Sequence, residues 1–169
     1  MSNNARRLIL SAALLYATLL LTAVALALAS PFSFDKSGVL PSGKKFSVTI
    51  SESPYKRHPD DLPDDGSRWG IDGGFPTPYC TTFAVKIDGK PVNLLRKSFQ
   101  DLSHLNSVEI SEENRNLVVS VQGGDAAGSF DARFIFREFE VERIVRSGEF
   151  PNSIWERTVY HNSLAVDVD

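Results

Sequence analysis

The chain of 169 residues contains one cysteine, Cys80, and only three histidines. A single cysteine excludes an intramolecular disulfide framework, so the hydrophobic core has to hold the fold. His58, His104 and His161 are isolated, and no C-x-x-C or H-E-x-x-H spacing occurs, which argues against a zinc site. We therefore expect no metal and no cofactor.

Acidic residues outnumber basic ones, 21 to 18. Residues 1–30 contain two arginines and no acidic residue, so the remainder carries 16 basic and 21 acidic side chains, a net charge of −5. Binding to nucleic acid needs a basic face that neutralises phosphates. The acidic balance argues against nucleic acid as a partner, and it makes an anionic lipid surface an unfavourable target.

One long apolar run stands at the N-terminal side. Residues 8–29, LILSAALLYATLLLTAVALALA, are 22 positions without a charge. A helix of that length spans about 33 Å at ~1.5 Å per residue, enough for a hydrocarbon core of about 30 Å. Arg6 and Arg7 precede the run, and positive charge stays on the cytoplasmic side. The pattern predicts a cytoplasmic segment at 1–7 and a transmembrane helix at 8–29 in the lipid bilayer, with the rest extracytoplasmic.

A cleaved signal sequence is the alternative for this segment. Ala27-Leu28-Ala29 supplies an A-x-A site, and cleavage there would give a secreted or periplasmic product that begins at Ser30. The apolar run is longer than the about 7 to 15 residues typical of a signal peptide. We favour a retained single-pass anchor in the cytoplasmic membrane of a bacterium.

The sequence after the apolar run contains a polar segment and then segments in which apolar residues recur at every second position. Residues 30–43 are rich in Ser, Gly and Pro and are typical of a linker. Residues 44–162 contain short segments in which apolar and polar residues alternate, which is the pattern of half-buried strands. Residues 163–169 are expected to form a C-terminal tail.

Seven segments are expected to form strands, at 44–52, 79–88, 106–113, 116–122, 129–136, 139–147 and 153–161. Asp88-Gly89 is typical of a two-residue hairpin turn, followed by an edge strand at 92–95 because Pro91 cannot donate to a ladder. Residues 97–105 could form one or two helical turns. The fold class predicted is mainly β: an antiparallel β-sandwich or small barrel after one transmembrane helix. Its expected core contains Phe83, Val85, Val119, Val121, Phe134 and Phe136.

A loop at about 53–78 is long for a compact domain, and loops longer than about 12 to 15 residues are usually functional or disordered. Its acidic side chains are weak candidates for calcium ligands: Asp60, Asp61, Asp64, Asp65 and Asp72. Their spacing does not match the D-x-D-x-D-G calcium loop, and no bidentate Glu follows. We favour a solvated loop over a calcium-stabilised module.

Trp69 suggests two further roles for this loop, a binding surface or a lid. With Arg68, Asp72 and Tyr79 it could form a surface that binds a glycan or an envelope protein, because a flat ring offers contact area at low entropic cost. The alternative is a lid that folds back over one open end of the core. We favour the lid, since a long loop needs an apolar anchor to be ordered.

No catalytic residues are expected. Gly66-Ser67-Arg68-Trp69-Gly70 places its serine one position too early for G-x-S-x-G, and it does not join a strand to a helix. The thiol of Cys80 is interpreted as a small buried hydrophobe. A small envelope hydrolase that uses the 60–80 loop remains the alternative from another functional class.

The segments Ser147–Pro151 and Trp155–Tyr160 follow a GEFPxxxWExTxY pattern. This ending, together with Trp69–Gly74, resembles those of uncharacterised exported bacterial proteins, and the resemblance implies no activity. The function favoured by the sequence is therefore binding or scaffolding at the cell envelope by a membrane-anchored β-domain.

Overall fold

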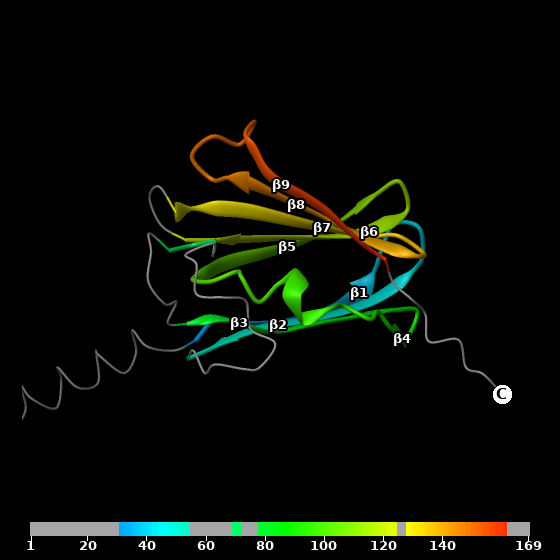
Figure 1. Cartoon of the computed structure of the whole chain (residues 1–169). Helices are drawn as coiled ribbons and strands as arrows, with labels where there is room; N and C mark the ends of the chain where they lie inside the picture. Colours follow the sequence, from blue (N-terminus) through cyan, green and yellow to red (C-terminus); the bar gives the residue numbers. More distant parts are fainter. Residues whose placement is uncertain (1–30, 55–68, 72–77, 125–127, 162–169) are drawn as a thin grey trace, which may run out of the picture. The chain divides into compact units, whose positions relative to one another are not determined.

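The computed structural model describes residues 31–54, 69–71, 78–124 and 128–161, which form nine strands and one 3-10 turn (Figure 1). The elements in chain order are β1 (Ser33–Val39), β2 (Lys45–Ser53), β3 (Tyr79–Ile87), β4 (Lys90–Pro91), η1 (Arg96–Ser98), β5 (Leu105–Glu113), β6 (Asn116–Gly123), β7 (Phe130–Phe136), β8 (Glu140–Ser147) and β9 (Ile154–His161). The prediction of a mainly β fold is confirmed.

The strands form two sheets, and every neighbouring pair within a sheet is antiparallel. One sheet has the order β1-β2-β3-β4 and the other β5-β6-β7-β8-β9, so each sheet follows the chain as a simple meander. In the residues that the structure describes, the two sheets stay separate, so the alternative of a closed barrel is wrong. The strand predicted at 153–161 is confirmed as β9.

The linker predicted at 30–43 is wrong, because residues 33–39 form β1. This strand pairs with β2 along its whole length, from Ser33 opposite Ser51 to Val39 opposite Lys45. A glycine inside a strand marks a close approach: a Cβ at Gly38 would lie 2.9 Å from Cζ of Phe46. The glycine content that suggested a linker therefore makes room for a core ring.

The hairpin at Asp88-Gly89 is confirmed, with φ values of 50° and 79° at its two central residues. The return strand is shorter than predicted, because β4 ends at Pro91 and residues 92–95 form no strand. The helical turns expected at 97–105 are reduced to η1, a single 3-10 turn.

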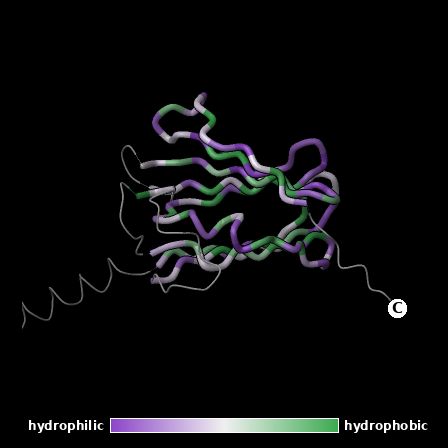
Figure 2. Tube along the Cα trace, viewed as in Figure 1, coloured by the Kyte–Doolittle hydropathy of each residue, from purple (hydrophilic) through white to green (hydrophobic). Residues whose placement is uncertain are grey.

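The hydrophobic core lies between the inner faces of the two sheets. All six residues predicted for it are buried: Phe83, Val85, Val119, Val121, Phe134 and Phe136. Phe83 of β3 meets Phe134 of β7 edge to face, with ring centroids 4.7 Å apart, so the contact crosses from one sheet to the other. Figure 2 shows hydrophobic and hydrophilic residues alternating along the strands, as one-sided burial requires.

No helix long and apolar enough to cross a bilayer occurs among the described residues. The transmembrane helix predicted at 8–29 lies outside them.

Candidate binding site

The most deeply buried charged side chain of the described residues is Arg143 of β8, which is 1 % exposed. Strand alternation turns it toward the opposite sheet, together with its core neighbours Val141 and Val145. Its guanidinium donates to both oxygens of Asp101, at 2.8 and 2.6 Å, and to the carbonyl of Ser98 at 3.0 Å. Burial raises the pKa of the Asp101 carboxyl, and the guanidinium opposes that rise. This contact fastens the segment after η1 to the five-stranded sheet.

The inner face of β9 continues this polar cluster. Oε2 of Glu156 lies 3.3 Å from Nη2 of Arg143, and Oγ1 of Thr158 donates to Oε1 of Glu156 at 2.7 Å. Burial raises the pKa of the Tyr160 hydroxyl one step further along the strand. The charged groups on this face, Arg143 and Glu156, therefore pair with groups within the fold.

Trp69 and Trp155 stack beside this cluster, with ring centroids 5.1 Å apart and an interplanar angle of 12°. The backbone N–H of Trp69 donates to the Asp101 carbonyl at 2.9 Å, and the Ser103 hydroxyl donates to the Trp69 carbonyl at 2.6 Å. Gly70 has a φ of +93°, and a Cβ there would lie 2.2 Å from the Ser103 carbonyl oxygen. The backbone of Trp69 is thus fixed by hydrogen bonds to Asp101 and Ser103.

Two of the residues predicted for binding, Trp69 and Tyr79, lie in the described part of the chain, and both form bridges to the segment Leu102–Ser103. Trp69 is half-buried and packs against the core, as the lid interpretation expects. Tyr79 is 2 % exposed, and its hydroxyl accepts a hydrogen bond from Nη2 of Arg96 at 3.2 Å, so its ring is not presented at the surface. Arg68 and Asp72 lie outside the described residues.

The calcium candidates Asp60, Asp61, Asp64 and Asp65 also lie outside the described residues, as does most of the loop considered for a hydrolase. Within the described residues, no group of three or more His, Cys, Asp or Glu side chains is arranged to hold a metal ion. Cys80 is buried, as predicted, and burial raises the pKa of its thiol. The calcium and hydrolase interpretations therefore stay predictions.

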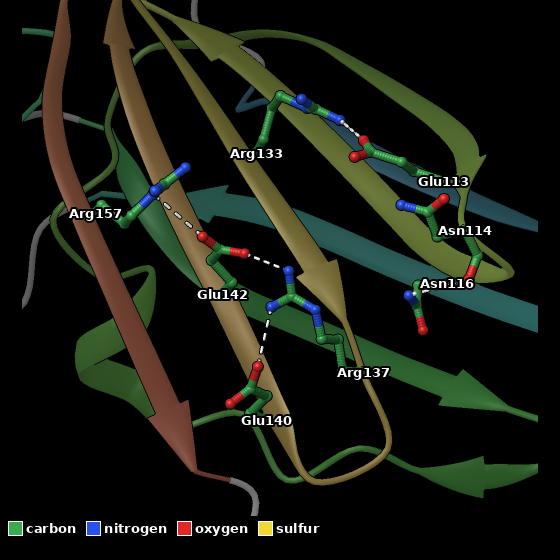
Figure 3. Close-up of polar contacts among 8 residues, drawn as sticks. All are labelled: Glu113, Asn114, Asn116, Arg133, Arg137, Glu140, Glu142 and Arg157. Carbon is green, nitrogen blue, oxygen red and sulfur yellow. Dashed lines mark hydrogen bonds and ion pairs between the residues drawn. The ribbon is translucent and has the colours of Figure 1, made fainter.

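The outer face of the five-stranded sheet carries a small buried cluster of Val118, Ile135 and Ile144. The register places Glu142 opposite Ile135 and Arg133 opposite Ile144. Figure 3 shows the ion pairs of this face: Glu142 lies between Arg137 and Arg157, and Arg133 contacts Glu113 at 2.6 Å. The aliphatic stem of an arginine can cover apolar surface while its guanidinium contacts a carboxylate. The outer face therefore combines a small apolar cluster with charged side chains that are paired with one another.

Strand β9 is the free edge of the five-stranded sheet. Three of the seven exposed large hydrophobic side chains in the described residues lie in it: Ile154, Trp155 and Val159. Its two charges already have partners, because Glu156 contacts Arg143 and Arg157 contacts Glu142. Natural proteins protect edges with charges, proline, short length or bulges. Strand β9 has eight residues and no proline, and its irregular pairing is confined to one end.

Strands β5 and β4, which form two of the other edges, differ from β9. Strand β5, the opposite edge of the same sheet, exposes polar residues such as Glu109 and Ser111. Strand β4 is two residues long and ends in Pro91. The register of β9 shifts where it passes Val145 and Arg146, which makes Trp155 a bulge residue and leaves regular pairing from Glu156 to His161. The candidate binding site is therefore the edge of β9 over these six residues.

Sequence reasoning missed this edge. The segment 153–161 mixes its faces because the bulge at Trp155 interrupts the alternation, and the position of a strand within a sheet is not encoded locally. The pairing of Arg143 with Asp101 joins positions 42 residues apart. Trp155, within the WExTxY pattern, was the only local signal.

Comparisons with protein-family models, with curated proteins and with solved structures found no match. The resemblance carried by residues 148–160 therefore stays a prediction.

Proposed function

We propose that the chain is a single-pass membrane protein whose β-domain, an extracytoplasmic β-sandwich, binds another protein of the cell envelope through the edge of β9. The observation that supports this most is the regular outer edge of β9 from Glu156 to His161, which contains the exposed Val159 and follows the exposed Ile154 and Trp155. Such an edge offers unpaired backbone N–H and C=O groups to an incoming strand.

The expected binding mode is the addition of an extended segment to the sheet. Backbone hydrogen bonds supply affinity in this mode, and alternate side chains supply specificity. On β9 the outward-facing Val159 would contact the partner beside the charged outer face, because it lies opposite Glu142 in the register. The inward-facing carboxylate of Glu156 is paired with Arg143, so it does not select a basic residue in the partner.

The membrane anchor is supported by the 22 uncharged residues at 8–29 and by Arg6 and Arg7 before them. It would keep the domain close to a membrane-bound or envelope partner. Extraction of membranes with carbonate tests it: the protein should stay with the lipid and keep its full mass. A soluble product that begins at Ser30 would replace the anchor by a cleaved signal sequence.

Photo-crosslinking of the full chain in its own membranes tests the binding edge. Val159 and Ser111 belong to one row across the outer face, at opposite edges of the sheet. A photoreactive residue at 159 should form an adduct with another envelope protein, and one at 111 should not. Equal adducts at both positions, or none at 159, would refute binding through β9.

A further inference from the structure

Strands β1 and β5 are edge strands of different sheets, and they lie side by side along one side of the domain. Near their starts, Glu52 of β2 accepts a hydrogen bond from the Leu105 N–H, and its own N–H donates to the Phe32 carbonyl just before β1. Near their ends, the Ser42 N–H donates to Oε2 of Glu112 at 2.9 Å. The two edges therefore run in the same direction with the core between their sheets.

A cleft of about 350 Å³ opens between these two edges. Its walls include side chains of the hydrophobic core: Leu40 and Phe46 are buried, and Ile110 of β5 is half-buried against the same core. Gly38 of β1 adds no side chain there, and the ring of Phe46 lies directly against it. Ligand sites are clefts of this size, mostly apolar, with a small number of polar groups that orient the ligand.

Lys36 supplies such a polar group. It lies opposite Val48 in the β1–β2 register, and Val48 is fully buried in the core, so the side chain of Lys36 leaves the backbone on the inner face. Lys36 is exposed and lines the cleft, and no described residue forms a hydrogen bond or an ion pair with its ammonium. The cleft therefore combines an apolar wall with an unpaired cation.

The other charge of the cleft lies away from Lys36. Glu112 is beside the turn that follows β1, where its carboxylate already accepts the Ser42 N–H, whereas Lys36 is in the first half of β1. An inward-pointing charged residue also protects a strand edge from pairing with another strand. These two observations favour a small anionic molecule over a cation or an added strand.

We propose that the cleft between β1 and β5 binds a small alkyl carboxylate. Its carboxylate accepts a charge-assisted hydrogen bond from the ammonium of Lys36. Its alkyl chain lies along Phe46 and Ile110, where burial of apolar surface contributes in proportion to the area covered. The site is independent of the proposed binding edge, because β5 and β9 are the opposite edges of the five-stranded sheet.

Photo-labelling of the full chain in phosphatidylcholine nanodiscs tests this site. The probe is decanoate that carries a diazirine near its methyl end, and mass spectrometry of the digested protein locates the adducts. Decanoate and decylamine, which have the same chain and opposite charges, serve as competitors. The variant Lys36→Glu is compared with Lys90→Glu, which makes the same change on the edge strand β4, outside the cleft.

In the wild type, adducts should form within residues 38–46 and 110–112, and excess decanoate should suppress them while decylamine should not. Lys36→Glu should lower their yield at least about fivefold, because repulsion replaces attraction at an exposed charge, and Lys90→Glu should keep the yield of the wild type. The carboxylate site is refuted by adducts that form only elsewhere or not at all. Equal suppression by the two competitors, or equal losses in the two variants, refutes it as well.

Discussion

Arg143 of β8 and Asp101 form a two-pronged ion pair inside the fold, with N–O distances of 2.8 and 2.6 Å. The arginine is 1 % and the aspartate 6 % exposed. Asp101 lies in the segment that joins the last short strand of one sheet to the first strand of the other, so the pair fastens this connection to the five-stranded sheet. Trp69, whose N–H donates to the Asp101 carbonyl, depends on the same connection.

Replacement of Asp101 by Asn should destabilise the fold by about 3 to 5 kcal/mol, because the buried guanidinium of Arg143 loses its closest carboxylate and keeps only the longer contact with Glu156. Denaturant unfolding of the full chain in detergent measures the loss. The matched control is Glu113→Gln, which breaks an ion pair with Arg133 whose side chains are 49 % and 30 % exposed. That change should cost at most about 1 kcal/mol. Equal losses in the two variants would contradict a structural role for the buried pair.

Glu52 predicts a dependence of stability on pH. This residue is 4 % exposed, and its carboxylate accepts a hydrogen bond from the Leu105 N–H at 2.9 Å, which links β2 to β5. Burial raises its pKa above the ordinary value of 4.5, and the hydrogen bond from Leu105 opposes the rise. The folded state therefore binds the proton more tightly than the unfolded state, and the free energy of unfolding falls as pH rises from 4.5 through the folded pKa.

The variant Glu52→Gln should keep the hydrogen bond to Leu105 and lose this pH dependence. Relative to the wild type, it should gain stability as pH rises from about 4.5 to the folded pKa, and the difference should stay constant above it. Thermal unfolding of both proteins between pH 4 and pH 8 provides the comparison. A wild type that becomes more stable than the variant with rising pH would show that the carboxylate form is the favoured one.

Alternation predicted most of the strands because each sheet buries one face. Alternation predicts β7, where Phe134 and Phe136 lie on the inner face, but it does not predict β1, whose Ser and Gly content is typical of a linker. The reason is tertiary: Gly38 is small so that the ring of Phe46 on β2 fits against it. Composition does not show which neighbour a glycine accommodates.

The candidate site could not be predicted from the sequence either, because it also depends on contacts between residues far apart in the chain. Trp69 was singled out, but its stacking partner Trp155 lies on a strand added at the far edge of the other sheet. The two charged residues of β9, Glu156 and Arg157, are paired with Arg143 and Glu142 of the neighbouring strand. Sheet order and long-range ion pairs carry this information, and local patterns do not.

Phe134 offers a direct test of the shared core. Its ring is fully buried and contacts Phe83 of the opposite sheet with ring centroids 4.7 Å apart. Phe134→Ala should therefore lower the free energy of unfolding by about 3 to 5 kcal/mol, the usual cost of truncating a core aromatic residue. Denaturant titration checks the value, with Phe139→Ala as the exposed control that should change little. A small loss at Phe134 would mean that the sheets do not depend on this contact.

Calcium should leave the melting temperature unchanged. The aspartates of the 60–72 segment do not have the spacing of a calcium loop, and a ligand that binds only the folded state would raise its stability. Thermal unfolding with millimolar calcium and with a chelator is compared, and magnesium serves as the control cation. A rise specific to calcium would establish the calcium-stabilised alternative.

Trp69→Ala should lower the melting temperature, because the ring packs against the core and stacks on Trp155. The backbone bonds of Trp69 to Asp101 and Ser103 persist in the variant, so the change isolates the ring. The loss should exceed about 1 kcal/mol, since an aromatic pair alone contributes about 0.5 to 1.5 kcal/mol beyond its buried area. Trp155→Ala removes the same stack from a more exposed position, and its smaller effect separates stacking from closure of the core. If the melting temperature is indifferent to Trp69→Ala, the ring serves as a binding surface and not as a lid.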